Sequence, residues 1–313
     1  MGLGNPDRPI GGLAVPRPPG VELRPLGRDD FDIALAFIRE LYALPETDVD
    51  VYRTRFEALI ADVDASPLLA LADGEPAGLV LFRFRRRPGW TTYEGWVSDL
   101  YVRPANRGRG IGRTLVAACI ADWRVRGGHR LTLETGYGNT AARGLYTDMG
   151  FVEAGRHYQQ RPVVVRGLGP LEGLDQRLPD VDDFQAVAAL LAELGVPVPS
   201  EERSDAVRRT FAELLRRPDT HCRLALRDGS PVGLVTVVLR EPFFAAAAQA
   251  WISELVVAES ARGQGIGRAL LDAALAEAAR GGAYAAVLEC VSPQALFAHA
   301  GFIDVGSFYT LAR

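Results

Sequence analysis

The sequence contains no lysine, and arginine alone supplies its 35 basic residues. Against 39 acidic residues this leaves a formal net charge of −4. Such a charge argues against a general binder of nucleic acid, because these proteins usually present a basic surface. Only three cysteines occur, Cys119, Cys222 and Cys290, and none belongs to a C-x-x-C pair. Scattered thiols are typical of a reducing compartment, so we expect a cytoplasmic protein whose cysteines are buried.

Histidine is also scarce, and the four histidines show no ligand spacing, so we expect no metal site. The longest apolar run, residues 243–252, is too short to span a bilayer, and the N-terminus shows no signal-peptide pattern. We therefore expect no membrane contact. Residues 1–20 are rich in glycine and proline, a composition typical of a flexible tail.

What the sequence does contain is an internal repeat. When the chain is shifted by 155 residues, residues 71–113 fall on residues 226–268 with 18 identities in 43 positions. Further along, a shift of 151 residues aligns Tyr158 with Tyr309. Because the period is a whole domain rather than 20–50 residues, it indicates two copies of one fold and not a solenoid.

Each copy mixes stretches of strand and of helix periodicity, which predicts an α/β domain with a mixed central sheet and helices on both faces. The sequence predicts this domain twice in tandem, over residues 21–166 and 171–313, with a Gly- and Pro-rich linker at 167–170. In the first copy we expect strands at residues 21–25, 68–71, 77–84, 96–102, 131–134 and 157–165, and helices at residues 31–41, 51–60, 111–126 and 141–148. The dipeptide Asp73-Gly74 predicts a tight hairpin turn.

A glycine-rich segment, residues 107–113, lies between a predicted strand and a predicted helix, and it returns as residues 262–268. Glycines allow a tight turn that brings several backbone N–H groups together, and a helix N-terminus favours an anion. The segment therefore predicts a phosphate or pyrophosphate site. It does not fit the dinucleotide-binding pattern G-x-G-x-x-G, because Arg113 or Leu115 stands at the last glycine, and a Walker loop would need a lysine.

The remaining pattern resembles the GNAT superfamily of acyl-CoA-dependent N-acyltransferases. The resemblance rests on residues 107–112, which read R-x-x-G-x-G after a strand ending at Val102, and on the later segment 139–151. It covers residues 21–165 well and residues 171–313 in part.

This resemblance implies that acetyl-CoA binds to the backbone of the first copy. The pyrophosphate would lie on Arg107, Gly108, Arg109, Gly110, Ile111, Gly112 and Arg113. The pantetheine arm would pair with Leu100, Tyr101 and Val102, and Asn139 would touch it or order its own loop. The corresponding residues of the second copy are Leu255, Val256, Val257, Arg262, Gly263, Gln264, Gly265, Ile266, Gly267 and Arg268.

Acyl transfer from a thioester to an amine needs an oxyanion donor, a neutral amine and an acid for the leaving thiolate. A strand N–H near Tyr101 suits the first role. The resemblance points Tyr146 at the sulfur, and a phenol with a pKa of about 10 can protonate a thiolate with a pKa of about 8.5. Asp99, Glu94 or a water molecule could serve as the base. We expect Cys119 to pack in the core rather than act as a nucleophile.

The second copy departs from the family pattern. Phe297 stands at the position of Tyr146, and the preceding loop is shorter and lacks the asparagine. We therefore expect the second copy to keep a CoA-type cleft but to catalyse poorly, as a scaffold or regulator, unless His299 or Tyr284 replaces the missing phenol.

The run of four arginines between residues 83 and 87 is expected to form a solvated sheet edge; contact with an acidic substrate or partner is the alternative. Trp90, Tyr93 and Trp96 follow closely and either line an acceptor pocket or pack in the core.

The sequence thus predicts an enzyme that moves an acetyl group from acetyl-CoA to a primary amine of a small molecule or peptide by direct attack. The alternative is a non-catalytic acyl-CoA sensor. The sequence does not identify the acceptor, and it leaves a homodimer open.

Overall fold

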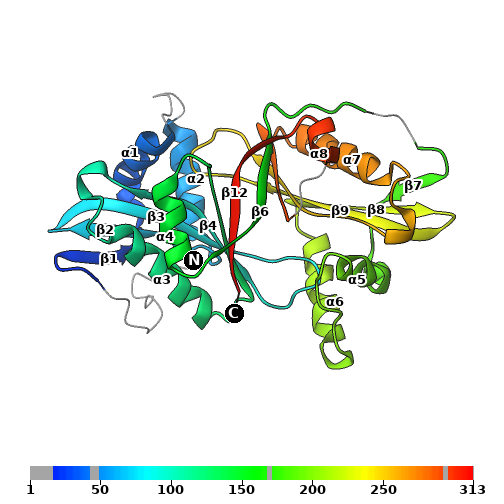
Figure 1. The fold of residues 1–313 in the computed structure, drawn as a ribbon, viewed down its shortest axis with the longest axis horizontal. Helices are drawn as coiled ribbons and strands as arrows, with labels where there is room; N and C mark the ends of the chain where they lie inside the picture. Colours follow the sequence, from blue (N-terminus) through cyan, green and yellow to red (C-terminus); the bar gives the residue numbers. More distant parts are fainter. Residues whose placement is uncertain (1–16, 43–48, 168–170, 292–294, 313) are drawn as a thin grey trace.

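The computed structural model describes residues 17–42, 49–167, 171–291 and 295–312, which form one continuous sheet flanked by helices (Figure 1). Residues 1–16 of the expected tail and residues 168–170 of the expected linker lie outside the described residues. None of the described helices is long and apolar enough to cross a membrane.

The first repeat contains the elements that its sequence predicts, with small shifts at their ends. They are β1 (Val21–Pro25), α1 (Phe31–Tyr42), α2 (Val49–Ala61), β2 (Leu68–Ala72), β3 (Glu75–Arg85), β4 (Glu94–Val102), α3 (Ile111–Val125), β5 (Arg130–Thr135), α4 (Thr140–Asp148) and β6 (Val152–Gln160). The hairpin prediction is confirmed, since Asp73 and Gly74 adopt φ values of 53° and 86° in the turn between β2 and β3.

The closing strand, however, was expected at residues 157–165 and instead begins at Val152 and ends at Gln160. Pro162 explains the earlier end, because proline has no N–H to donate to a strand ladder.

The second repeat contains the same series of elements. They are β7 (Leu174–Arg177), α5 (Phe184–Ala192), α6 (Glu201–Leu215), β8 (Thr220–Arg227), β9 (Ser230–Arg240), β10 (Gln249–Val257), α7 (Ile266–Arg280), β11 (Ala285–Cys290), α8 (Ala295–His299) and β12 (Ile303–Ala312). The hairpin turn recurs at Asp228 and Gly229, with φ values of 50° and 75°.

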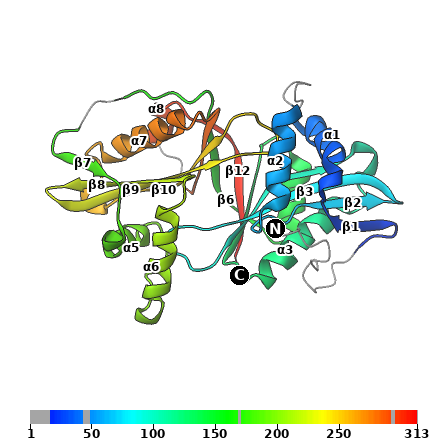
Figure 2. The same cartoon turned by 180° about the vertical axis from the view of Figure 1, so that it is seen from behind.

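The two repeats exchange their last strands. The twelve strands follow the order β1-β2-β3-β4-β5-β12-β6-β11-β10-β9-β8-β7. Strand β12 of the second repeat pairs with β5, with Tyr309 opposite Leu133, and β6 of the first repeat pairs with β11, with Tyr158 opposite Leu288. Figures 1 and 2 show β6 and β12 side by side at the centre of the molecule. The expected boundary near residue 167 thus separates the repeats along the chain, but neither repeat forms a sheet of its own.

Helices cover both faces of each half because neighbouring strand residues point to opposite sides. In β2 and β3, Leu68 and Val80 pack with α3, whereas Leu69 and Leu79 pack with α1 and α2. The strand exchange also reaches these cores. Tyr309 packs in the α3 core of the first half, and Tyr158 packs in the α7 core of the second.

Candidate active site

The glycine-rich loop of the first half presents a set of unused backbone donors. It connects β4 to α3, and Gly110 caps the helix in a left-handed conformation with φ 80°. Gly108 also has a positive φ, 77°, and a Cβ there would meet nothing within 4 Å. Within the described residues, no N–H group of residues 108–113 donates to a backbone acceptor outside the helix's own ladder. Such a group of free amides at a helix N-terminus is suited to an anion.

The arginine side chains of this loop are held away from its backbone. Arg107 Nε donates to the carbonyl of Val102 at 3.1 Å. Arg109 forms an ion pair with Asp73 at 2.8 Å, and Arg113 forms one with Asp148 at 3.1 Å. These side chains therefore do not cover the loop amides, and Pro18 is the neighbour that lies closest to Gly110.

Strand β4 separates from β5 beside this loop. The two strands pair in parallel only from Glu94 to Val97 on β4. The predicted pantetheine residues Leu100, Tyr101 and Val102 pair with β3 alone, so their other backbone edge is open towards the gap. This open edge is where an extended arm could add as a further strand.

Tyr146 and Asn139 belong to α4, on the far side of the gap. Asn139 caps this helix, and its side chain accepts from the N–H of Ala142 at 3.2 Å, so it orders its own loop. Tyr146 is buried, with its ring centroid 6.0 Å from that of Phe151 and 5.9 Å from that of Tyr309. Burial, followed by the charge of nearby carboxylate, raises the pKa of Tyr146 well above its usual value, so the phenol keeps its proton.

Cys119 lies on the buried face of α3, as the sequence indicates. Burial raises the pKa of this thiol well above its usual range, so the nucleophilic thiolate is not formed.

Asp99 is buried on β4, and both of its oxygens already accept hydrogen bonds. Tyr42 donates its hydroxyl to one oxygen at 2.6 Å, and Ser98 donates to the other at 2.7 Å. Burial raises the pKa of Asp99, although these hydrogen bonds and the charge of Arg83 lower it in part. The two hydrogen bonds stabilise the anionic form of Asp99 and so reduce its affinity for an incoming proton.

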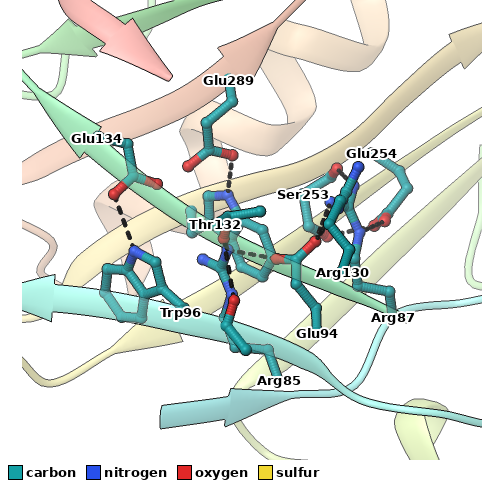
Figure 3. A network of polar contacts seen from close by, with 12 residues as sticks. Arg85, Arg87, Glu94, Trp96, Arg130, Thr132, Glu134, Ser253, Glu254 and Glu289 are labelled. Carbon is teal, nitrogen blue, oxygen red and sulfur yellow. Dashed lines mark hydrogen bonds and ion pairs between the residues drawn. The ribbon is translucent and has the colours of Figure 1, made fainter. Parts of the chain in front are cut away.

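Glu94 is the centre of an ion-pair network rather than a group facing substrate. It is fully buried and pairs with Arg85, Arg87 and Arg130 (Figure 3). Burial alone would raise the pKa of Glu94, but the three guanidinium groups together lower it well below its usual range. We therefore do not retain Glu94 as a base, because a carboxylate stabilised so strongly as an anion has little affinity for a proton.

The same network corrects the expectation of a solvated arginine edge. Arg87 also pairs with Glu254 of the second repeat at 2.7 Å, and Arg83 pairs with Asp62 at 2.9 Å. Arg85 and Arg87 are almost buried, with side-chain exposures of 9% and 17%. The expectation was wrong for Arg85 and Arg87 because the buried carboxylates of Glu94 and Glu254 neutralise them.

A cavity of about 850 Å³ lies between the two halves. The first repeat contributes Tyr42, Arg83, Arg85, Trp96, Asp99, Glu134 and His157, and the second contributes Arg240, Phe243, Phe244, Gln249 and Trp251. Tyr42 stacks on Phe244 with ring centroids 4.2 Å apart, so the β9–β10 loop of the second half closes over α1.

Of the three expected acceptor-pocket aromatics, only Trp96 lines this cavity. Trp90 stacks on His129 at 3.9 Å, and Tyr93 packs against Phe84 at 5.8 Å, so both serve the packing of the first half.

Two cavity carboxylates were missed by the sequence reasoning. Glu134 of β5 and Glu289 of β11 occupy corresponding positions, separated by the same 155 residues as the repeat. Trp96 donates its indole N–H to Glu134 at 2.9 Å, and Trp251 donates its own to Glu289 at 2.7 Å (Figure 3). Because the two glutamates are separated by the repeat shift, the sequence alone could have indicated that they occupy equivalent positions.

The two carboxylates are strongly coupled. Ligand-type atoms of Glu134, His157 and Glu289 all lie within 4.8 Å of one another. Burial and the charge of Glu289 raise the pKa of Glu134 to about 8, so at neutral pH this carboxyl carries a proton. The three groups could hold a metal ion by distance, but the guanidinium groups of Arg85 and Arg240 beside them oppose a further cation.

The second half keeps the loop but lacks the phenol. Gly265 caps α7 with φ 81°, and residues 263–268 show the same lack of backbone acceptors within the described residues. Phe297 is buried with its ring centroid 5.4 Å from that of Tyr158. Tyr284 accepts from Gln249 at 3.3 Å, and the carbonyl of His299 accepts from Arg166, so neither is shown in the role of the missing acid.

Comparison with known proteins places this geometry in context. Residues 34–151 and 187–302 each match the model of the acetyltransferase (GNAT) family. An aminoalkylphosphonate N-acetyltransferase of Salmonella typhimurium is 39% identical over 102 residues, which cover 33% of this chain and 64% of that protein. A glucosamine 6-phosphate N-acetyltransferase of Oryza sativa subsp. japonica is 31% identical over 140 residues, which cover 42% of this chain and 81% of that protein.

Solved structures match the tandem arrangement over nearly the whole chain. A GCN5-related N-acetyltransferase from Sphaerobacter thermophilus superposes with a TM-score of 0.59 at 21% identity, covering 95% of this chain and 97% of that one. A tandem GNAT protein from the clavulanic acid biosynthesis pathway gives a TM-score of 0.56 at 18% identity, covering 93% and 98%. At these identities the likeness concerns the fold.

Proposed function

The chain belongs to the acetyltransferase (GNAT) family and is an acyl-CoA-dependent acetyltransferase, and from this premise we propose that its first half acetylates a primary amine of a small molecule. The observation that carries the proposal is the set of free amides at residues 108–113 next to the open edge of β4. Both relatives named above act, by their names, on small amines, which supports a small acceptor over a peptide.

In this proposal the donor lies across the gap between β4 and β5. The loop amides hold the pyrophosphate of acetyl-CoA, and the backbone of Leu100 to Val102 pairs with the pantetheine arm. A strand N–H near Tyr101 then donates to the thioester oxygen as negative charge develops on it. The acetyl group thereby faces the cavity between the halves.

The acceptor amine attacks from the cavity. Its nitrogen forms a bond to the acetyl carbon, the carbon–sulfur bond breaks, and the nitrogen loses one proton. Tyr146 donates its hydroxyl in a hydrogen bond to the departing thiolate. Its raised pKa keeps the phenol protonated and favours this hydrogen bond over complete proton transfer, so the thiolate takes its proton from solvent.

For the proton lost by the amine we favour Glu134 over Asp99. A hydrogen bond to Glu289 stabilises a proton taken up by Glu134, whereas the hydroxyl groups of Tyr42 and Ser98 stabilise the anionic form of Asp99. A carboxyl with a pKa of about 8 holds a proton firmly once it has taken it up, and its ionised fraction, which grows as the pH rises through 8, is the form that accepts the amine proton.

The second half serves the first in this proposal. Its glycine-rich loop retains the capacity to hold a CoA pyrophosphate, but Phe297 has no proton to give. Its β9–β10 loop and Trp251 complete the wall of the acceptor cavity, so catalysis depends on both repeats.

The proposal is tested with the whole chain, because the strand exchange leaves neither repeat complete. A panel of amines is incubated with acetyl-CoA, and released thiol is measured alongside calorimetric binding of CoA. We expect amine-dependent thiol release and measurable CoA binding. Absence of CoA binding would overturn the donor site, and binding without transfer to any amine would overturn the acceptor assignment.

A further inference from the structure

The cavity between the halves contains a partly buried arginine that forms no ion pair within the described residues. Arg240 ends β9 and lines the cavity. Its Nε and Nη1 atoms are buried, and neither has a hydrogen-bond partner within the described residues. Burial, together with the charge of Arg85, lowers the pKa of Arg240 to about 9, so at neutral pH the guanidinium still carries its charge. A buried charge left unpaired is costly, and an anionic ligand would offset that cost.

A second guanidinium stands beside the first. Arg85 occupies the corresponding position in the first repeat, 155 residues earlier, and its Nε and Nη1 atoms are also buried without partners. Two indole rings hold both groups in place. The carbon of the Arg85 guanidinium lies 4.7 Å from the Trp96 ring and 3.9 Å from the Trp251 ring, and that of Arg240 lies 4.2 Å and 4.8 Å from the same rings. Arg85 is partly neutralised by Glu94, which leaves Arg240 as the stronger attraction for an anion.

Against the effect of burial, the charges of Glu289 and Glu134 raise the pKa of Arg240, but within the described residues neither carboxylate forms an ion pair with it. Arg83 and Asp99 are engaged with Asp62, Tyr42 and Ser98. Glu134 lies on the same wall. The cavity therefore offers a donor for an oxyanion and, separately, an acceptor for an amine proton.

We propose that the acceptor is a small amine that carries an oxyanion, with the oxyanion held by Arg240 and Arg85 and the amine directed towards Glu134. The inference rests on the proposed acetyl transfer and names its substrate class. A phosphonate, a phosphate or a carboxylate shares the chemistry that a guanidinium recognises. The oxyanion takes no part in bond making, so its role is to position the amine. Because Arg240 belongs to the second repeat, that repeat determines which acceptor the first repeat acetylates.

The first test compares acceptors that differ only in the anion. Thiol release from acetyl-CoA is measured with aminoethylphosphonate, with the aminocarboxylate of the same length, and with ethylamine. We expect a higher kcat/KM for at least one anionic acceptor, by roughly 10- to 150-fold, the size of a charge-assisted hydrogen bond. The better of the two anionic acceptors identifies the oxyanion. Equal or better use of ethylamine by the wild-type chain would overturn the proposal.

The second test removes the cation. Arg240→Met should raise KM for the anionic acceptor by roughly 10- to 150-fold, a clearly larger loss than the same variant shows with ethylamine. Because each variant is compared with the wild type on the same acceptor, differences in amine basicity cancel. Arg240→Lys should recover part of the loss. Arg217→Met is the matched control, since Arg217 lines the same cavity but is paired with Asp219 at 2.7 Å. An equal loss with ethylamine would show a structural role and contradict the proposal.

A binding measurement separates this inference from the proposed function. Ethylphosphonate has no amine and cannot be acetylated, and its binding can be followed by the fluorescence of the tryptophans that contact Arg240. Saturable binding that Arg240→Met abolishes supports the oxyanion site even where no amine is acetylated, in which case acetyl transfer alone fails. Amine acetylation without any Arg240-dependent binding of ethylphosphonate or aminocarboxylate overturns the oxyanion site and leaves acetyl transfer standing.

Discussion

Glu134 and Glu289 come from corresponding strands of the two repeats, and the strand exchange brings their carboxylates within 4.8 Å of each other. Each accepts a hydrogen bond from the tryptophan of its own repeat. The two carboxyl groups nevertheless differ in pKa. Burial and the charge of Glu289 raise the pKa of Glu134. Burial would also raise the pKa of Glu289, but electrostatic interaction with Arg85, His157 and Arg240 lowers it below its usual value. Although the two residues occupy equivalent positions in the repeats, Glu134 can therefore act as a proton acceptor, whereas Glu289 stays ionised.

The raised pKa of Glu134 predicts how turnover depends on pH. A base works only when it is unprotonated, and Glu134 has a pKa of about 8. Turnover should therefore rise with pH through a value near 8 and fall as the pH drops below it. Initial rates of thiol release between pH 6 and 10, at saturating acetyl-CoA and amine, measure this profile.

The variant Glu134→Gln keeps the size of the side chain and removes the titration. It should lower kcat by at least about 100-fold and abolish the inflection near pH 8. Asp99→Asn is the comparison, because Asp99 is a second carboxylate that lines the same cavity. Loss of the inflection in Asp99→Asn and its retention in Glu134→Gln would return the role of base to Asp99.

Glu94→Gln is predicted to act on stability. The substitution leaves Arg85, Arg87 and Arg130 without the buried charge that they share. Removing one partner of a buried ion pair typically costs about 3–5 kcal/mol, so the urea midpoint should fall clearly. Asp182→Asn is the control, since its ion pair with Arg208 is exposed and should contribute less than about 1 kcal/mol. An unchanged midpoint combined with an altered pH profile would instead make Glu94 a base.

The sequence predicted the features that depend on local backbone constraints. Gly110 and Gly265 recur because each must adopt a positive φ where a strand passes into a helix, and the Asp-Gly turns recur for the same reason. Tyr146 was found because it lies at a fixed distance from this pattern. The structure buries Tyr146 in the α3 core, and the role that the resemblance implies for it stays a prediction.

The strand exchange and the composite cavity could not be predicted in this way. Strands β6 and β12 carry equivalent residues such as Tyr158 and Tyr309, so either strand fits beside either β5 or β11. The sequence pattern is compatible with each strand pairing within its own repeat and with each strand pairing in the other repeat. Which of the two occurs depends on the three-dimensional course of the chain. The arginine run shows the same limit, since its burial depends on Glu94 and on Glu254 from another repeat.

Tyr146→Phe is expected to slow chemistry without weakening the binding of CoA. The ring remains in its buried site, so packing with Phe151 is kept, but the hydrogen bond to the thiolate is lost. We expect kcat to fall by about 100-fold or more, with the calorimetric Kd for CoA unchanged. Tyr309→Phe is the control, because this neighbouring phenol is 5.9 Å away and its hydroxyl accepts from Arg143. Normal turnover by Tyr146→Phe would show that another group stabilises the thiolate.

The two glycine loops allow a matched pair of substitutions that assigns the donor site. Gly108→Asp and Gly263→Asp each place a negative charge at an equivalent point, with φ values of 77° and 76° and nothing within 4 Å of the added Cβ. If the first half catalyses, Gly108→Asp should abolish turnover by repelling the pyrophosphate, whereas Gly263→Asp should remove only a second CoA from the calorimetric stoichiometry.

Asparagine at the same two positions separates charge from backbone strain. Gly108→Asn carries the same strain as Gly108→Asp, and asparagine tolerates a positive φ, so most CoA binding and turnover should be retained. Equal loss in both Gly108 variants would mean that strain distorts the loop and that repulsion of an anion is not the cause. Loss of turnover in Gly263→Asp with full activity in Gly108→Asp would place the chemistry in the second half, where Tyr158 from the exchanged strand is the phenol beside Phe297.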